Sequence, residues 1–208
     1  MASSKSTTQK MPKHSELCAF AADVHALAVE KGWYETPRAW DELVFLVQGE
    51  LHEASDCLRS GHSEEHMWVG GVTPGRLVLA NDGTLMVADD DVLIDYTAHV
   101  HGGPEGFLIE IADACIRALD AISYRTSKPL IVPAPGHGEI VRIENTSARR
   151  LVITHALALG SETSPRDLSD LVRECLEWAH VHNHPLWDAM KLKHGYNKTR
   201  GHKHGKAY

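Results

Sequence analysis

Apolar residues recur every three or four positions over most of the chain, the spacing that places them on one face of a helix. Serine or proline stands before several of these stretches, where it can cap a helix or occupy its first turn. Glycine often follows them, as it does at helix ends. The pattern predicts helices over about 15–31, 37–61, 106–124, 147–160, 164–182 and 186–199.

Two segments break the helical pattern. In 62–104, apolar stretches at 76–80 and 84–88 flank the turn sequence Asn-Asp-Gly, which is typical of a β-hairpin. The segment 127–146 is rich in proline and glycine and predicts a loop, with short strands at 130–132 and 139–143. We therefore predict a mainly α fold, an antiparallel helical bundle with a small β-hairpin insertion. One domain spans 15–208, with insertions at about 62–104 and 125–160, after a disordered tail over 1–14.

Composition narrows the class of protein. The apolar fraction of 43% and the charged fraction of 24% are ordinary for a soluble globular chain. The net charge of -7 argues against a nucleic-acid partner. There is no apolar run of membrane-spanning length and no secretory signal, so we expect no membrane partner. The four cysteines lack a CxxC motif and lie in apolar helical stretches, which favours buried free thiols in a reducing cytoplasm.

Two pairs of acids suggest a chemistry. Glu50 and Glu53 lie on one predicted helix, and Glu110 and Asp113 lie on a later one. Side chains three residues apart project from the same helix face, so two such helices packed together would bring four carboxylates to one place. Solvated surface charge is the ordinary reading of one such pair, but both pairs stand among apolar neighbours. Four converging carboxylates repel one another unless cations neutralise them. Because Mg²⁺ prefers oxygen ligands, we expect a Mg²⁺ site here, with Mn²⁺ as a possible substitute.

A basic segment near the C-terminus is suited to an anion. Residues 191–206 contain six lysine or arginine residues and no acid. On a continuing helix Lys193, Tyr196, Asn197 and Arg200 share one side. Lys193 and Arg200 would clamp phosphate oxygens, and Tyr196 and Asn197 would contact sugar or base. The alternative is a flexible, solvated tail.

Other candidates carry less weight. Asp120 follows Asp113 by two turns and is either an outer acid of the metal site, a partner of a basic residue, or a surface acid. Trp33, Tyr34 and Trp40 precede the first acidic helix and either stack on a base or pack in the core. The histidines show no zinc-binding spacing.

Three stretches together resemble a known family. Residues 43–61, 104–120 and 193–206, which carry ExxE, ExxD and YNxxR, are similar in order and content to the MazG-like all-α nucleoside triphosphate pyrophosphohydrolases of phages and bacteria. The resemblance implies Mg²⁺-dependent hydrolysis of nucleoside triphosphates, with dNTPs favoured, to a monophosphate and pyrophosphate. Glu50, Glu53, Glu110 and Asp113 would hold the metal. One of the catalytic pair Glu50 and Glu53 would take the proton of the attacking water.

The resemblance also implies a homodimer or homotetramer. The long connection between the two acidic pairs departs from the family's short one, so the inserted β segment is expected to be separable from the metal site. Two other classes stay open. One is a non-catalytic nucleotide-binding or regulatory helical bundle. The other is a nucleic-acid-binding protein that uses the basic segment, a class that the net acidic charge opposes.

Overall fold

The computed structural model describes residues 11–69, 75–79, 85–89, 92–95, 103–126 and 143–205 of the 208-residue chain. The fold is mainly helical with a small antiparallel sheet, which confirms the predicted fold class. Its helices are α1 (His14–Glu30), α2 (Trp40–Arg59), α4 (Phe107–Thr126), α6 (Ala148–Ala158), α7 (Pro165–Val181), α8 (Leu186–Thr199) and the short 3-10 helix η1 (His202–Gly205).

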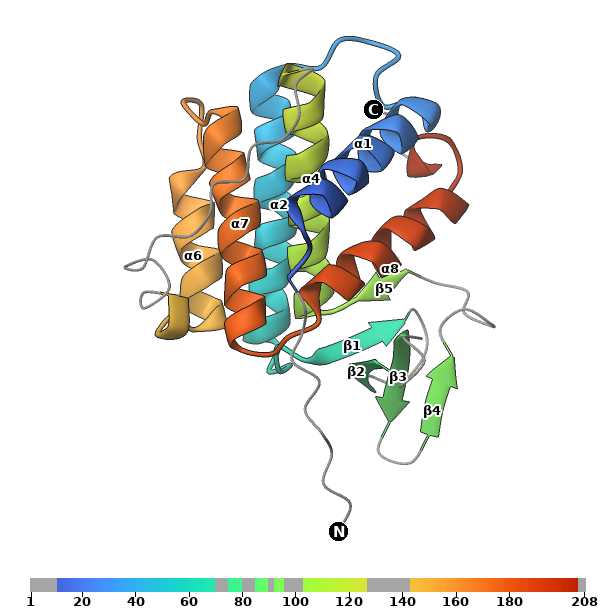
Figure 1. Ribbon diagram of the computed structural model, residues 1–208, viewed down its shortest axis with the longest axis vertical. Coiled ribbons are helices and arrows are strands. Elements are labelled where there is room, and N and C mark those ends of the chain that lie inside the picture. The colour runs from blue at the N-terminus through green and yellow to red at the C-terminus, as the bar shows by residue number, and fades with distance from the viewer. Residues whose placement is uncertain are drawn as a thin grey trace.

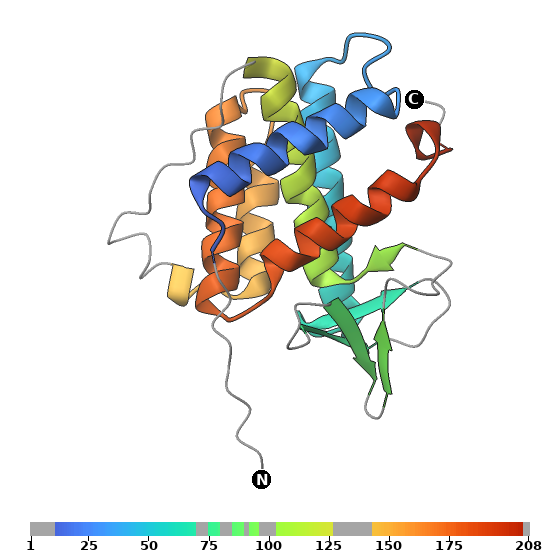
Figure 2. The same ribbon diagram turned by 45° about the vertical axis from the view of Figure 1, so that its right-hand side comes forward.

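Four helices run side by side, and two others cross them. Figure 1 shows α2, α4, α6 and α7 aligned in a bundle, with α2 and α4 running in opposite directions. α1 and α8 lie obliquely across α4, as both views show (Figures 1 and 2). α4 contacts α1, α2, α7 and α8 and is therefore the central helix of the fold. Fourteen of its residues are buried, which agrees with the apolar residues that its sequence carries on nearly every side of the helix.

The helix boundaries follow local signals in the sequence. Ser147 caps α6 by accepting a hydrogen bond from the backbone N–H of Arg150. Ser164 and Asp167 form a reciprocal capping box at the start of α7. Gly32 follows α1 at a φ of +84°, a conformation that favours glycine. α2 begins at Trp40 rather than near residue 37, because Ala39 is still extended and serves as the N-cap.

The inserted segment forms more than a hairpin. Its strands are β1 (His66–Val69), β2 (Gly75–Leu79), β3 (Leu85–Asp89), β4 (Val92–Asp95) and β5 (Pro104–Glu105), arranged antiparallel in the order β4-β3-β2-β1-β5. The predicted hairpin is β2 and β3, in which Leu79 pairs with Leu85. The pairing of β1 with β5 could not be predicted because β5 has only two residues, too few to show an alternating pattern.

The sheet joins the bundle at the end where α2 stops and α4 begins (Figure 2). β1 and β5 contact α4, and Gly106 makes the turn from β5 into that helix at a φ of +125°. A Cβ atom on Gly106 would collide with the backbone carbonyl of His66. The close approach of β1 to the start of α4 therefore requires glycine at this position.

The remaining predictions on organisation have mixed outcomes. The predicted strands at 130–132 and 139–143 fall outside the described residues except for Ile143, which lies in a helical turn and is buried. Of the predicted disordered tail, residues 1–10 lie outside the description, but Met11 packs against the core. Cys57, Cys115 and Cys175 are buried free thiols, and Cys18 is half-buried. Among the described helices, none combines the length and the apolar character needed to cross a membrane.

Candidate functional site

The two acidic pairs converge, as the helix spacing predicts. α2 presents Glu50 and Glu53 toward α4, and α4 presents Glu110 from its first turn. Glu50, Glu53 and Glu110 each place one carboxylate oxygen within 4.8 Å of the others. Glu50 and Glu110 are buried, whereas Glu53 is exposed. Asp113 is buried one turn further along α4 and faces the same cavity, but it stands outside this group of three.

Two cations accompany the acids, the buried Lys193 and the partly buried Arg117. The Arg117 Nε donates to Glu50 Oε1 at 2.9 Å. The Lys193 Nζ lies 3.3 Å from Asp113 Oδ2 and also donates to the backbone carbonyl of Pro104 at 3.3 Å. Lys193 was predicted to contact phosphate, and the structure places it instead against one of the predicted metal ligands. Arg117 was not predicted, although it follows Asp113 by one helical turn on the same face of α4.

Burial is the main influence on the pKa values of the acids. Burial raises the pKa of Glu110 to about 8, with Lys193 opposing the rise and Asp113 and Glu50 adding to it. Burial, followed by the charge of Asp113, raises the pKa of Glu50. Burial would lower the pKa of Arg117 and of Lys193, but the neighbouring acids overcome it and raise both values. The Glu110 carboxyl is therefore mostly protonated at pH 7, and a bound cation would favour its ionised form.

The acids line one side of an open cavity of about 540 Å³. Its walls come from four parts of the fold: α2, the inserted strands β1 and β5, α4 and α8. Beyond the acids and the two cations, the lining includes Cys57, His62, Trp68, Tyr196 and Arg200. This volume lies within the range of about 300–1,000 Å³ typical of small-molecule sites. The cavity thus combines charged and aromatic side chains in its walls.

The C-terminal segment is folded onto the bundle as far as the structure describes it. Lys191, Lys198 and Lys203 pair with Asp188, Asp23 and Glu35. The segment has no acid of its own between 191 and 206, but the fold supplies acids from α1, from the turn after α1 and from the start of α8. The alternative of a flexible tail is wrong for residues 191–205.

Arg200 differs from these lysines. It makes no ion pair with the residues that the structure describes, and its guanidinium lies 5.7 Å from the centre of the Tyr196 ring. Both side chains line the large cavity. Arg200 is therefore a cation at the cavity wall that an anionic ligand can engage.

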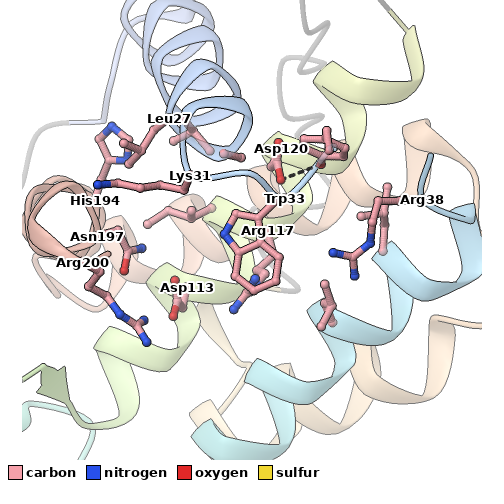
Figure 3. A pocket seen from close by; sticks show the side chains of 16 residues that line it. Leu27, Lys31, Trp33, Arg38, Asp113, Arg117, Asp120, His194, Asn197 and Arg200 are labelled. Atoms are coloured by element: carbon pink, nitrogen blue, oxygen red, sulfur yellow. Dashed lines mark hydrogen bonds between the residues drawn. The ribbon is translucent and has the colours of Figure 1, made fainter. Parts of the chain in front are cut away.

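A second, smaller cavity of about 60 Å³ adjoins the first. Figure 3 shows Trp33 in its centre, near Arg38 and Arg117, with Asn197 and Arg200 reaching in from α8. The guanidinium carbons of Arg38 and Arg117 lie 5.7 and 6.0 Å from the Trp33 ring centre. The Oδ1 atom of Asn197 is buried with no hydrogen-bond partner among the described residues. This predicted substrate residue therefore lines the smaller cavity rather than the larger one.

The other sequence candidates have structural partners. Asp120 accepts hydrogen bonds from the Tyr34 hydroxyl and from the His25 ring, both at 2.7 Å. Of the three readings of Asp120, the structure thus supports a partner of a basic residue. Trp40 donates its indole N–H to the carbonyl of Thr163 and packs against the core. Trp33 and Tyr34 both border the smaller cavity, which Asp113 also lines.

The acidic group suits a divalent cation. The carboxylate oxygens of the three residues lie within 4.8 Å of one another. Side-chain adjustments of about an ångström would let each oxygen lie about 2.1 Å from a Mg²⁺ ion placed between them. The donor set consists of carboxylate oxygens, which a hard cation prefers. The raised pKa of Glu110 gives a second reason, since a bound cation would offset the burial, and the smaller repulsion from Asp113 and Glu50, that raise this pKa.

Comparison with protein-family models, with curated proteins and with solved structures finds no match to this chain. The similarity of its motifs to the MazG-like pyrophosphohydrolases therefore stays a prediction.

Proposed function

We propose that this protein is a Mg²⁺-dependent nucleoside triphosphate pyrophosphohydrolase that acts preferentially on dNTPs. The observation that carries the proposal is the convergence of Glu50, Glu53 and Glu110 from two antiparallel helices, in the wall of a cavity of about 540 Å³. Asp113 faces the same cavity. A group of carboxylates beside a space of this size is suited to a substrate that arrives with its own metal and phosphates.

Glu50, Glu53, Glu110 and Asp113 are the residues that would hold the metal, and Mn²⁺ would substitute for Mg²⁺. A bound divalent ion supplies charge neutralisation of the phosphates and lowers the pKa of a coordinated water. Asp113 would join the ligand set by releasing Lys193, which now lies 3.3 Å from it. Glu53 is the exposed member of the acidic group and makes the better proton acceptor, because Glu50 is engaged by Arg117.

The reaction assigns distinct tasks to these side chains. Water attacks the α-phosphorus, its proton passes to the Glu53 carboxylate, and the bond from the α-phosphorus to the bridging oxygen breaks. That oxygen leaves on pyrophosphate with the bonding electron pair. Arg200, unpaired and at the cavity wall, would bind the departing phosphates, and Lys193 would join it once freed from Asp113. The motif resemblance adds a homodimer or homotetramer to the proposal.

A non-catalytic nucleotide-binding protein is the second candidate. It is favoured by the ion pairs of Arg117 with Glu50 and of Lys193 with Asp113, because these cations already neutralise two of the acids. The group of Glu50, Glu53 and Glu110, which has the carboxylate oxygens that a divalent cation prefers, favours the metal enzyme instead.

The test is product analysis over a panel of dNTPs and NTPs with Mg²⁺, with Mn²⁺ and with EDTA. The enzyme is expected to release monophosphate and pyrophosphate in equal amounts with either metal and neither product in EDTA. Orthophosphate as the first product would indicate a different phosphohydrolase. Nucleotide binding without turnover under every condition would establish the second candidate.

A further inference from the structure

The inserted strands form a wall of the large cavity. Trp68 of β1 and Pro104 and Glu105 of β5 line it together with the acids of α2 and α4. The acidic group itself contains no residue of the insertion, so the expectation that the metal site does not require the insertion stays a prediction. Residues from β1 and β5 border the same space as Glu50 and Glu110.

Trp68 is held in place from several directions. Its indole N–H donates to Glu105 Oε2 at 2.6 Å, and the two residues are paired across the β1–β5 ladder. The His62 ring packs against the indole with 4.5 Å between ring centres. The chain before α4 is also tightly fitted, because a Cβ on Gly103 would lie 3.0 Å from the Tyr196 ring. An aromatic side chain fixed in this way binds a flat ligand group at little cost in entropy.

The relative sizes of the two cavities decide where a base fits. The cavity beside Trp33 measures about 60 Å³ and the one beside Trp68 about 540 Å³. The smaller one has room for water-sized groups, whereas the larger one is of the size that holds a whole small ligand. Among the described residues that line the larger cavity, His62, Trp68 and Tyr196 are the aromatic side chains available to the base of a nucleotide whose phosphates lie at the acids.

We propose that Trp68 stacks on the base of the nucleotide, so that the inserted β1–β5 pair is the part of the protein that selects the substrate. This inference rests on the proposed function, since it assumes that the phosphates bind at Glu50, Glu53 and Glu110. Stacking on an indole requires a planar base and is independent of the phosphates. It therefore predicts a loss of binding confined to ligands that carry a base.

The experiment compares Trp68→Ala, Trp68→Leu and Trp68→Phe with the parent protein on the best dNTP. Loss of one base–aromatic stack is expected to raise KM roughly 5- to 150-fold in the Ala and Leu variants, and less in the Phe variant, which keeps a ring. Inorganic tripolyphosphate with Mg²⁺, which has no base, is used as a competitive inhibitor. Its inhibition constant is expected to stay unchanged in all three variants.

A matched control is Phe45→Ala, because Phe45 is 69% exposed on α2 and does not line the cavity. An unchanged KM in Trp68→Leu would overturn the inference. A rise in KM matched by an equal rise in the inhibition constant of tripolyphosphate would also overturn it, because it would show that Trp68 only maintains the shape of the cavity. If the parent protein hydrolyses no triphosphate, the proposed function fails by itself. Calorimetric binding of dNTP and of tripolyphosphate to the same variants then still tests the stacking.

Discussion

Lys193→Met should destabilise the metal-free protein and make its stability depend strongly on Mg²⁺. The side chains of Lys193 and Asp113 are only 9% and 10% exposed, and the ammonium lies 3.3 Å from the carboxylate. Methionine keeps most of the side-chain volume but removes the cation. Asp113 then stays buried beside Glu110 and Glu50 with one positive neighbour fewer.

The magnitude follows from this burial. Removing one partner of a buried ion pair costs about 3–5 kcal/mol. The lower end applies here, because the acids can take up protons once the cation is gone, and the pKa of Glu110 already stands at about 8. A loss of about 3 kcal/mol lowers the Tm of a chain of this length by roughly 6–12 °C.

The assay is thermal unfolding in EDTA and at saturating Mg²⁺. Bound Mg²⁺ replaces the missing charge, so its addition should raise the Tm of Lys193→Met by more than it raises that of the parent. Lys191→Met is the matched control. It lies on the same helix, but its side chain is 51% exposed in its pair with Asp188, so its Tm should change by only about 2 °C or less. A Lys193→Met variant with the Tm of this control, or with no larger response to Mg²⁺, would refute the reasoning.

Three further predictions follow from individual contacts. Glu53→Gln should reduce Mg²⁺-dependent turnover at least a hundredfold with an unchanged Tm, because Glu53 is exposed and the change preserves its shape; turnover near that of the parent protein would contradict its role. Arg200→Ala should raise the KM for dNTPs more than tenfold, whereas Lys198→Ala should not, since Lys198 is paired with Asp23 away from the cavity. Ser164→Ala should lower the unfolding free energy by about 1 kcal/mol at pH 7. Hydrogen bonds from Ser164 lower the pKa of Asp167 below its ordinary value of 3.8. The difference in unfolding free energy between Ser164→Ala and the parent is therefore fully present above pH 3.8 and should shrink as the pH falls below that value. Denaturant titrations of both proteins at pH 7 and at pH 3 measure this difference.

The helices could be predicted because each carries its own signals. Periodicity, a capping serine and a following glycine are local features, and the predicted range 186–199 matches α8 exactly as the structure bounds it. The convergence of the acids could also be predicted. Residues three apart on one helix share a face, so two such helices that pack together with these faces inward bring their acids close to one another. Glu50, Glu53 and Glu110 are found together for that reason.

The partners of the charged residues could not be predicted. Asp23 binds His194 and Lys198 across more than 170 positions, and Glu35 binds His202 and Lys203 across a similar separation. No local pattern marks such pairs, because they depend on how α8 and η1 lie relative to α1 and the turn that follows it. The position of Trp68 at the cavity could not be predicted for the same reason. Only the return of β5 beside β1 brings it to the cavity that the acids occupy.

The glycine turn between β5 and α4 has a consequence for how sequences of this kind can diverge. Residue 106 tolerates no side chain, since one would meet the carbonyl of His66, and the strand pair that it anchors borders the cavity. β2, β3 and β4 extend outward from that pair in the sheet order. Changes in the length or composition of the outer strands would leave the acids undisturbed. The insertion thus combines a constrained strand pair beside the cavity with outer strands that join the bundle only through that pair in the sheet order, so the sheet can vary at its outer edge while the cavity wall is kept.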